Sequence, residues 1–289
     1  MIYIRNLKNK KLIQLCKLLY CIIDLKYEID KGDKLEINKV INIDCLEGSK
    51  GIKDKSIDMV FCDLPFGVTK NSWDNIIPFE NLWAEINRVK KDNAAVCLFA
   101  EGKFLGELMC SNLKKYRYKI VCKKRQSKGW LNAKKMPLKT HEDILIFYDN
   151  LPIYNPQKTT GHEPVHKFHT RHTGSNYNRA DASNSGGGST ERYPVDVLEF
   201  AWDTLTIHPT QKPIKLCEWF IKTYTDEGMT VLDLTTGYGS IPLAAKKLNR
   251  NFIAFDNGIC EKQGEYYGRS WAELANERIL DFNFEEEKY

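Results

Sequence analysis

Four consecutive residues, Asp63-Leu64-Pro65-Phe66, place a carboxylate, a stiff turn and a flat aromatic ring at the end of one apolar run. That run, residues 57–62, predicts a buried strand, and open α/β sheets bind ligands at the carboxyl ends of their strands. An amino group on an aromatic base is a poor nucleophile because its lone pair is delocalised into the ring. Two acceptors aimed at its hydrogens, the Asp63 carboxylate and the Leu64 carbonyl, would make the nitrogen more reactive. A simple strand-to-loop turn with a buried Phe66 is the structural alternative.

A second unit, residues 231–256, predicts a strand, a glycine turn, a helix and a further strand. Gly237 and Gly239 let the backbone of the turn approach a ligand closely, and Asp233 ends the first strand. Asp256 ends the second strand, where a carboxylate can accept hydrogen bonds from both ribose hydroxyls of an adenosine cofactor. The third glycine of the dinucleotide fingerprint is absent. The unit therefore favours S-adenosylmethionine over NAD, and a purely structural turn is the alternative.

Strands and helices alternate on both sides of a polar middle segment, which predicts an α/β fold with a mostly parallel sheet. Strands are expected at residues 40–43, 57–62, 94–99, 119–122, 144–148, 230–234 and 252–256, and helices at 78–89, 214–224, 241–248 and 266–280. Residues 150–206 are rich in Gly, Ser, Asn and His, and the run Ser183–Thr190 predicts a flexible linker. The amphipathic run Leu12–Leu25 predicts a helix that is too short and too interrupted to span a membrane.

The chain has 289 residues, of which 42% are hydrophobic and 28% charged, as in ordinary globular proteins rather than disordered ones. A net charge of +5 is compatible with a polyanionic partner without establishing one. The nine cysteines include no CxxC pair, which indicates reduced thiols. The histidines His162, His166, His169 and His172 are spaced as metal ligands could be. No metal site is expected, because Pro164 and Gly174 would interrupt a helix there and no cysteine or acidic cluster joins the histidines.

Four motifs in a fixed order resemble those of the beta-class DNA amino methyltransferases, a family that includes many restriction-modification and phage enzymes. The tetrapeptide Asp63–Phe66 resembles the family's (D/N/S)PP(Y/F) motif, and Ile43–Glu47 resembles its GDCLE segment. His208–Pro213 keeps the family's HPTQKP motif intact, and Asp233–Ser240 resembles its DPFxGSGT cofactor loop. This permuted order, with the catalytic motif first and the cofactor loop last, is that of the class. The likeness covers residues 39–279, with lesser similarities at Trp73-Asp74 and Lys139–Asp143.

The resemblance implies a Rossmann-like methyltransferase fold, a mixed but mostly parallel sheet with helices on both faces. It implies methyl transfer from S-adenosylmethionine to the exocyclic N6 of a flipped adenine, with Asp63, Leu64, Pro65 and Phe66 as catalytic residues. Asp63 favours adenine because cytosine-N4 enzymes more often carry Ser there, and cytosine-N4 methylation is the alternative. The implied cofactor-binding residues are Asp44, Cys45, His208, Thr210, Lys212, Asp233, Thr235, Thr236, Gly237, Gly239, Ser240 and Asp256.

The same resemblance divides the chain into a helical extension (1–38), a catalytic half (39–122), a target-recognition insert with a flexible loop (123–206) and a cofactor-binding half (207–289). Cationic side chains contact phosphates and aromatic ones stack on bases. The expected DNA-binding residues of the insert are therefore Lys123, Lys124, Arg125, Lys128, Trp130, Lys134 and Lys135, with a solvated basic loop as the alternative. Double-stranded DNA is the expected partner, a homodimer is left open, and the expected location is the cytoplasm of a bacterial or phage-infected cell.

Three residues depart from the family's motifs. Leu64 stands where the first Pro is usual, Thr235 where the cofactor loop carries Phe, and Asp256 where Glu is more common. The backbone carbonyl of Leu64 survives the change of side chain, so catalysis stays the expectation. A non-catalytic DNA-binding protein that keeps the fold is the alternative from a different functional class.

Overall fold

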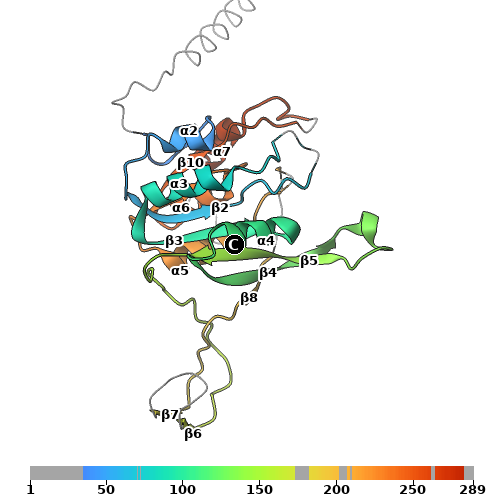
Figure 1. Cartoon of the computed structure of the whole chain (residues 1–289). Coiled ribbons are helices and arrows are strands. Elements are labelled where there is room, and N and C mark those ends of the chain that lie inside the picture. Colours follow the sequence, from blue (N-terminus) through green and yellow to red (C-terminus); the bar gives the residue numbers. More distant parts are fainter. Residues whose placement is uncertain are drawn as a thin grey trace, which may run out of the picture. The chain divides into compact units, whose positions relative to one another are not determined.

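The structure is a computed structural model that describes residues 35–69, 71, 73–172, 182–201, 207–208, 210–261 and 264–282. An eight-stranded sheet has the strand order β1-β10-β9-β2-β3-β5-β4-β8 (Figure 1). Its members are β1 (Lys39–Ile41), β2 (Ile57–Cys62), β3 (Lys90–Ala100), β4 (Tyr116–Lys128), β5 (Lys139–Phe147), β8 (Val197–Glu199), β9 (Thr230–Asp233) and β10 (Asn251–Phe255). The helix expected over Leu12–Leu25 lies outside the described residues.

Strands β1, β10, β9, β2 and β3 run parallel, and β5 is antiparallel to both β3 and β4. Residues 59–62 of β2 are fully buried, which explains why this end of the strand is a continuous apolar run and not an alternating one. Because β2 pairs with β9, the carboxyl ends of these two strands lie side by side. Asp63 and Asp233, far apart in the sequence, therefore meet at one edge of the sheet.

Helices cover both faces of the sheet (Figure 1). They are α2 (Cys45–Ser49), α3 (Phe79–Val89), α4 (Gly102–Ser111), α5 (Ile214–Tyr224), α6 (Ser240–Lys247) and α7 (Trp271–Leu280). Met59 and Phe61, alternate residues of β2, pack in one core with apolar side chains of α5, α6 and α7. Leu82, Ile86 and Val89 of α3 are buried at helical spacing, and α3 contacts α2 and α4. The predicted mixed, mostly parallel α/β fold is confirmed.

Strand β4 extends well beyond the predicted residues 119–122, because it pairs with β5 in a long antiparallel ribbon. The ribbon projects past the rest of the sheet and ends in a 3-10 turn, Trp130–Asn132 (Figure 1). The linker predicted over Ser183–Thr190 is wrong for its first four residues. They lie in β7 (Ala182–Gly186), which pairs antiparallel with β6 (Phe168–His172) and so satisfies backbone groups that a linker would leave to solvent.

Helices α2 and α4 and strand β8 are not anticipated from the sequence. Helix α2 and strand β8 are very short, so local patterning gives little signal for them. The buried residues of α4, Phe104 and Leu108, are four positions apart, which is a helical signal that the prediction missed. Within the described ranges, no helix is both long enough and apolar enough to cross a membrane.

Candidate active site

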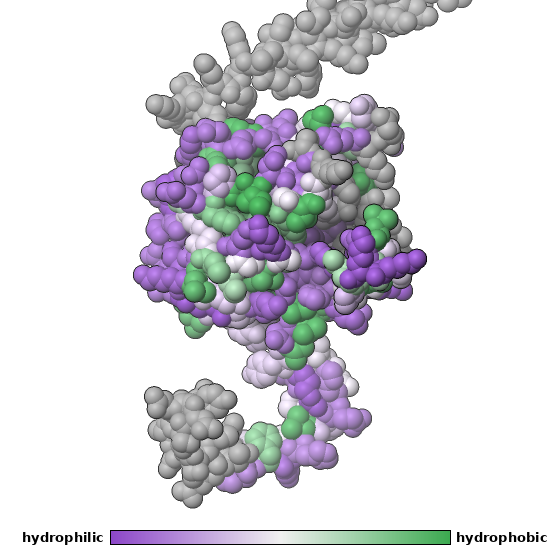
Figure 2. Space-filling view, turned by 45° about the vertical axis from the view of Figure 1, so that its right-hand side comes forward, coloured by the Kyte–Doolittle hydropathy of each residue, from purple (hydrophilic) through white to green (hydrophobic). Residues whose placement is uncertain are grey.

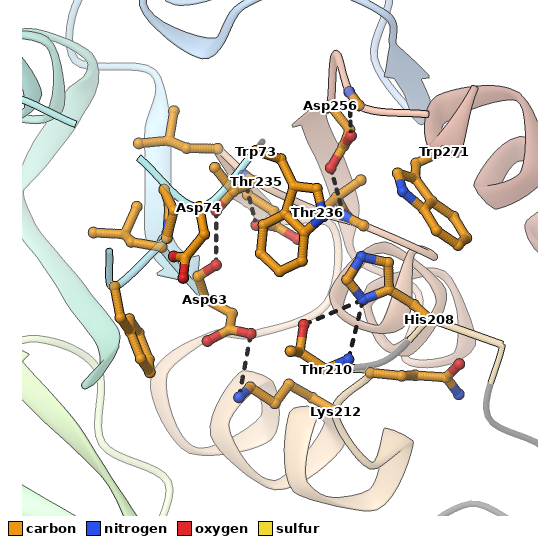
Figure 3. Close-up of a pocket in the computed structure, with 18 of the residues that line it drawn as sticks. Asp63, Trp73, Asp74, His208, Thr210, Lys212, Thr235, Thr236, Asp256 and Trp271 are labelled. Atoms are coloured by element: carbon orange, nitrogen blue, oxygen red, sulfur yellow. Dashed lines mark hydrogen bonds and ion pairs between the residues drawn. The ribbon is translucent and has the colours of Figure 1, made fainter. Parts of the chain in front are cut away.

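A cavity of about 580 Å³ opens where β2 and β9 end. All four predicted catalytic residues line it, and so does every predicted cofactor-binding residue except Gly239. In Figure 3, Asp63 and Lys212 lie on one side of the cavity, and Asp256 and Trp271 lie on the other. Segments that are distant in the sequence therefore form one site.

The Asp63 carboxylate is held by a buried lysine. Lys212 Nζ lies 3.2 Å from Asp63 Oδ2 and 3.0 Å from Glu142 Oε2, and the Lys212 residue is only 8% exposed. Burial raises the pKa of Asp63 to about 6, against the opposing effect of Lys212. Asp63 is therefore mostly ionised at neutral pH. Lys212 was predicted to bind cofactor. It lines the cavity, and its ammonium lies between two carboxylates, with the Phe99 ring 4.5 Å away.

A second lysine continues this charge network. Lys124 Nζ lies 3.1 Å from Glu101 Oε2 and 3.6 Å from Glu142 Oε2, and Glu101 also pairs with Lys139. Although burial acts to raise it, the pKa of Glu142 is held below its ordinary value by Lys212 and Lys124. Lys124 was predicted to contact DNA. Its position in this buried network argues against that contact.

The loop after the tetrapeptide is held by Asp74, a residue to which the sequence assigned no role. Its carboxylate accepts backbone hydrogen bonds from Gly67 at 2.8 Å, Val68 at 3.0 Å and Thr69 at 2.6 Å. Burial opposes ionisation, but the hydrogen bonds from Thr69, Gly67 and Val68 keep the pKa of Asp74 below its ordinary value. Asp74 is 6% exposed, so this small loop is built around a buried anion.

Phe66 forms part of the cavity wall. Its ring stacks on Phe104 of α4, with centroids 4.9 Å apart and planes inclined by 23°. Phe104 therefore covers one face of the ring and fixes its orientation. Phe66 also lines the cavity, which is where a planar ligand could stack on it.

The carboxyl ends of β9 and β10 carry two further carboxylates, Asp233 and Asp256. Asp256 accepts hydrogen bonds from the backbone of Gly237 and of Gly258, each at 2.8 Å. Burial raises the pKa of Asp256, and it raises that of Asp233 to about 7, with a smaller contribution from Asp63 and Asp256. Carboxylates crowded in this way are stabilised by any cation that enters the cavity.

The two glycines of the turn have different roles. Gly237, at φ +52°, lines the cavity beside the His208 ring. Gly239, at φ +77°, precedes α6, and a Cβ added there would lie 3.0 Å from the Cβ of Ala275 in α7. Gly239 therefore permits close packing of α6 against α7. It was predicted to bind cofactor, but it does not line the cavity.

Aromatic rings close the remaining wall. His208 packs against Trp271 with centroids 4.5 Å apart and against Trp73 at 5.7 Å. Its Nδ1 accepts a hydrogen bond from the backbone N–H of Thr210 at 3.3 Å. Burial, followed by the nearby Lys212, lowers the pKa of His208 to about 4, so the ring is neutral at physiological pH. Neither Trp271 nor Tyr238, which also lines the cavity, was predicted from the sequence.

The carboxylates that line the cavity suit a cationic adenosine cofactor. Asp44, Asp63, Asp233 and Asp256 all face the cavity, and S-adenosylmethionine carries a sulfonium and an ammonium group against one carboxylate. Burial, with smaller contributions from Asp63 and Asp256, raises the pKa of Asp233 to about 7, so a positively charged ligand group would stabilise its ionised form. Asp44 also caps α2, accepting from Leu46 N at 2.9 Å, which fixes its carboxylate at the rim. Among residues with described positions, no group of three or more His, Cys, Asp or Glu side chains could hold a metal ion.

Residues 57–266 match the family model for the N6 and N4 DNA methylases, so the match spans most of the chain. The chain belongs to this DNA methylase family. Over 274 residues it is 22% identical to the Type II methyltransferase M.HpaI of Haemophilus parainfluenzae, covering 85% of this chain and 75% of the relative. Over 259 residues it is 23% identical to the Type II methyltransferase M1.MboII of Moraxella bovis, covering 82% and 96%.

Solved structures of this family share the fold. The M1.HpyAVI–SAM complex matches with a TM-score of 0.53 at 19% identity, covering 83% of this chain and 98% of that one. The PvuII DNA methyltransferase, described as cytosine-N4-specific, matches with a TM-score of 0.55 at 15% identity, covering 86% and 94%. As a restriction-modification type DNA methylase, the protein uses S-adenosylmethionine and acts on DNA, as the sequence predicted.

The predicted DNA-binding residues lie along the β4–β5 ribbon and at its tip. Arg125, Lys134 and Lys135 are exposed, and Trp130 is 69% exposed at the tip. Lys128 lies near the tip and also lines the cavity, which places the ribbon beside the cavity mouth. Lys123 pairs with Glu199 at 2.9 Å. The sequence missed Leu131, which is 100% exposed beside Trp130.

Proposed function

We propose that this DNA methylase transfers a methyl group to the exocyclic N6 of adenine in double-stranded DNA. The observation that carries the proposal is the Asp63 carboxylate, which is ionised above about pH 6 and faces the cavity that the cofactor-loop residues also line. An acceptor in this position can orient an amino group toward the methyl donor.

The mechanism follows from the two acceptors of the tetrapeptide. The Asp63 carboxylate and the Leu64 carbonyl accept hydrogen bonds from the two amino hydrogens, which favours a tetrahedral nitrogen whose lone pair is available. No described residue donates a hydrogen bond to the Leu64 carbonyl, whereas the Asp63 carbonyl accepts one from Thr235. When bound, S-adenosylmethionine supplies an electrophilic methyl group. Asp63 is placed to take the proton that the amino group releases, and Phe66 stacks on the base.

The carboxylates on the cofactor side of the cavity are assigned to groups of S-adenosylmethionine. We assign Asp256 to the ribose hydroxyls and Asp233 to the positively charged groups of the cofactor, with Asp44 nearest the adenosine. His208 stays neutral at physiological pH and provides an aromatic edge between Trp73 and Trp271. Neutrality supports this assignment, because a protonated ring would repel a cationic cofactor.

The β4–β5 ribbon is assigned to the DNA duplex. We infer that the exposed side chains of Arg125, Lys134 and Lys135 contact phosphates. The exposed pair Trp130 and Leu131 can pack against or between bases. Figure 2, which turns the ribbon side of the molecule toward the viewer, shows hydrophobic residues interspersed among hydrophilic ones. The exposed positive charges of Arg125, Lys134 and Lys135 suit a polyanionic partner.

The test is nucleoside mass spectrometry of DNA treated with the purified protein and isotopically labelled S-adenosylmethionine. Labelled N6-methyladenine is the expected product. Labelled N4-methylcytosine alone would show that cytosine is the target base and would overturn the preference for adenine that Asp63 indicates. The absence of any labelled nucleoside, with cofactor and DNA both bound, would support the non-catalytic alternative.

A further inference from the structure

One hydrogen bond joins the cofactor loop to the catalytic tetrapeptide. The Thr235 hydroxyl donates to the backbone carbonyl of Asp63 at 3.0 Å (Figure 3). Thr235 itself follows Asp233, whose Oδ1 accepts from the Thr235 backbone at 3.3 Å. The side chain that was predicted to bind cofactor is therefore directed at the backbone of the catalytic residue.

This bond continues the pairing between β2 and β9 beyond the strands. The paired register of the two strands ends at Val60 and Leu232. Two residues further, the Leu234 backbone N–H donates to Cys62 Sγ at 3.3 Å, and in the next pair the Thr235 hydroxyl donates to the Asp63 carbonyl. The loop that carries the catalytic residue is thus tied, residue by residue, to the loop that carries Asp233.

The bond acts on the peptide plane that leads into Leu64. The Asp63 carbonyl and the Leu64 N–H belong to one planar peptide unit, so a restraint on the oxygen also orients the Leu64 nitrogen. Proline at this position would fix its own φ at about −65° through its ring, whereas leucine leaves that rotation open. The Leu64 side chain is 3% exposed, and this burial supplies a second restraint.

We propose that Thr235 is a positioning residue that holds the Asp63–Leu64 peptide in its catalytic orientation, in place of the proline ring that Leu64 lacks. The two departures from the family's motifs, Leu64 and Thr235, are then linked, because the Thr235 hydrogen bond replaces the restraint that proline would supply at position 64. This inference rests on the proposed function, because the orientation matters only if Asp63 and Leu64 accept hydrogen bonds from the target amino group.

The central comparison is Thr235→Val against Thr235→Ser in the full-length protein. Valine keeps the shape but removes the donor, so kcat should fall about tenfold, as for a small misplacement of a reacting group. Serine keeps the donor, and its kcat should stay within about twofold of the wild type. The affinity for S-adenosylmethionine, measured by calorimetry, should change less than about twofold in both variants. Thr223→Val is the matched control, because Thr223 Oγ1 donates to a backbone carbonyl within α5 at 2.7 Å, and Thr223 is not among the residues that line the cavity.

A readout that does not need activity separates this inference from the proposed function. Amide hydrogen exchange in the peptide spanning residues 63–69 should be about tenfold faster in Thr235→Val than in the wild type or Thr235→Ser. Unchanged exchange would overturn the positioning role even if the protein methylated no DNA. A loss of cofactor affinity with kcat retained would also overturn it, because Thr235 would then be a cofactor contact.

The link to Leu64 is tested by a double-mutant cycle. In a Leu64→Pro background, Thr235→Val should reduce kcat by less than about twofold, because the ring supplies the restraint. An equal tenfold loss in both backgrounds would contradict the linked change. If Leu64→Pro does not fold, the serine and valine comparison still decides whether Thr235 positions the peptide.

Discussion

Replacing Lys212 by methionine should move the acid limb of the pH–rate profile to higher pH. Lys212 Nζ lies 3.2 Å from Asp63 Oδ2, and the proposed mechanism needs that carboxylate ionised. Burial raises the pKa of Asp63 to about 6, although Lys212 acts to lower it. Methyl transfer by the wild type should therefore rise with pH through about 6 and level off above it.

The size of the shift follows from the contact. An opposite charge at this distance lowers a carboxyl pKa by about 1–3 units, so removing it should raise the pKa of Asp63 from about 6 to about 7–9. This corresponds to about 1.4–4 kcal/mol between the two protonation states. With a midpoint near pH 8, about a tenth of the variant would be ionised at pH 7. Its rate should then be about tenfold below wild type at pH 7 and recover by about pH 9.

The assay is kcat/KM for DNA between about pH 5 and 9, at saturating S-adenosylmethionine so that cofactor binding does not contribute. Glu142→Gln is the control of opposite sign, because the Glu142 carboxylate acts to raise the pKa of Asp63. That variant should move the midpoint to lower pH. Equal midpoints in all three proteins, or shifts in the same direction for both variants, would refute the reasoning.

Stability should report the same change. The folded-state pKa of Asp63 lies above its ordinary value, so its ionisation costs stability as pH rises through the folded pKa. Without Lys212 the ionised carboxylate is buried without its main partner, at a cost of about 3–5 kcal/mol for a broken buried pair. The melting temperature of Lys212→Met should therefore fall more steeply between pH 6 and 9 than that of the wild type.

Two further predictions concern the loop and the ribbon. Asp74→Ala leaves three backbone N–H groups without their acceptor. The free energy of unfolding, measured in urea, should fall by about 3 kcal/mol, and kcat should fall by at least tenfold. A variant with wild-type kcat would show that catalysis does not depend on this anchor of the loop. Replacing Lys134 and Lys135 together by alanine should reduce the slope of log K for DNA against log salt by about two. The control Lys114→Ala should leave the slope unchanged, because Lys114 is exposed just before the start of β4, at the opposite end of this strand from the ribbon tip. Equal slopes for the wild type and the Lys134/Lys135 double variant would show that these ribbon lysines do not contact phosphates.

The location of the site could be predicted because its signals are local. A parallel strand that is buried on both faces is rich in apolar residues, so the apolar residues 59–62 indicate that Asp63 lies at the carboxyl end of a strand. The same logic places Asp233 and Asp256. Their meeting in one cavity also depends on the order of the strands, which the sequence did not predict and which the pairing of β2 with β9 supplies.

The partners of the site residues could not be predicted, because they are fixed by tertiary contacts. Lys212 belongs to a motif associated with the cofactor, yet its ammonium lies between Asp63 and Glu142, which comes from a strand 70 residues earlier. Asp74 anchors its loop through backbone N–H groups, and such bonds leave no periodic signal in the sequence. Trp271 reaches the cavity through the packing of α7.

The ribbon shows the same limit in the secondary structure. The polar, basic residues of β4 beyond Cys122 have no apolar alternation, so the strand is formed by pairing with β5 and not by a buried face. The Gly-Ser run in β7 is likewise ordered by a partner strand. Propensity argues against both assignments, and cross-strand hydrogen bonding overrides it.

The most direct test of the central claim is Asp63→Ala, assayed for methyl transfer to DNA and, by calorimetry, for S-adenosylmethionine binding. Methyl transfer should fall by about a hundredfold or more, the usual effect of removing one group that stabilises the transition state. The affinity for the cofactor should stay within about threefold of the wild type, because Asp233 and Asp256 are untouched. Full methyl transfer by Asp63→Ala would contradict the account.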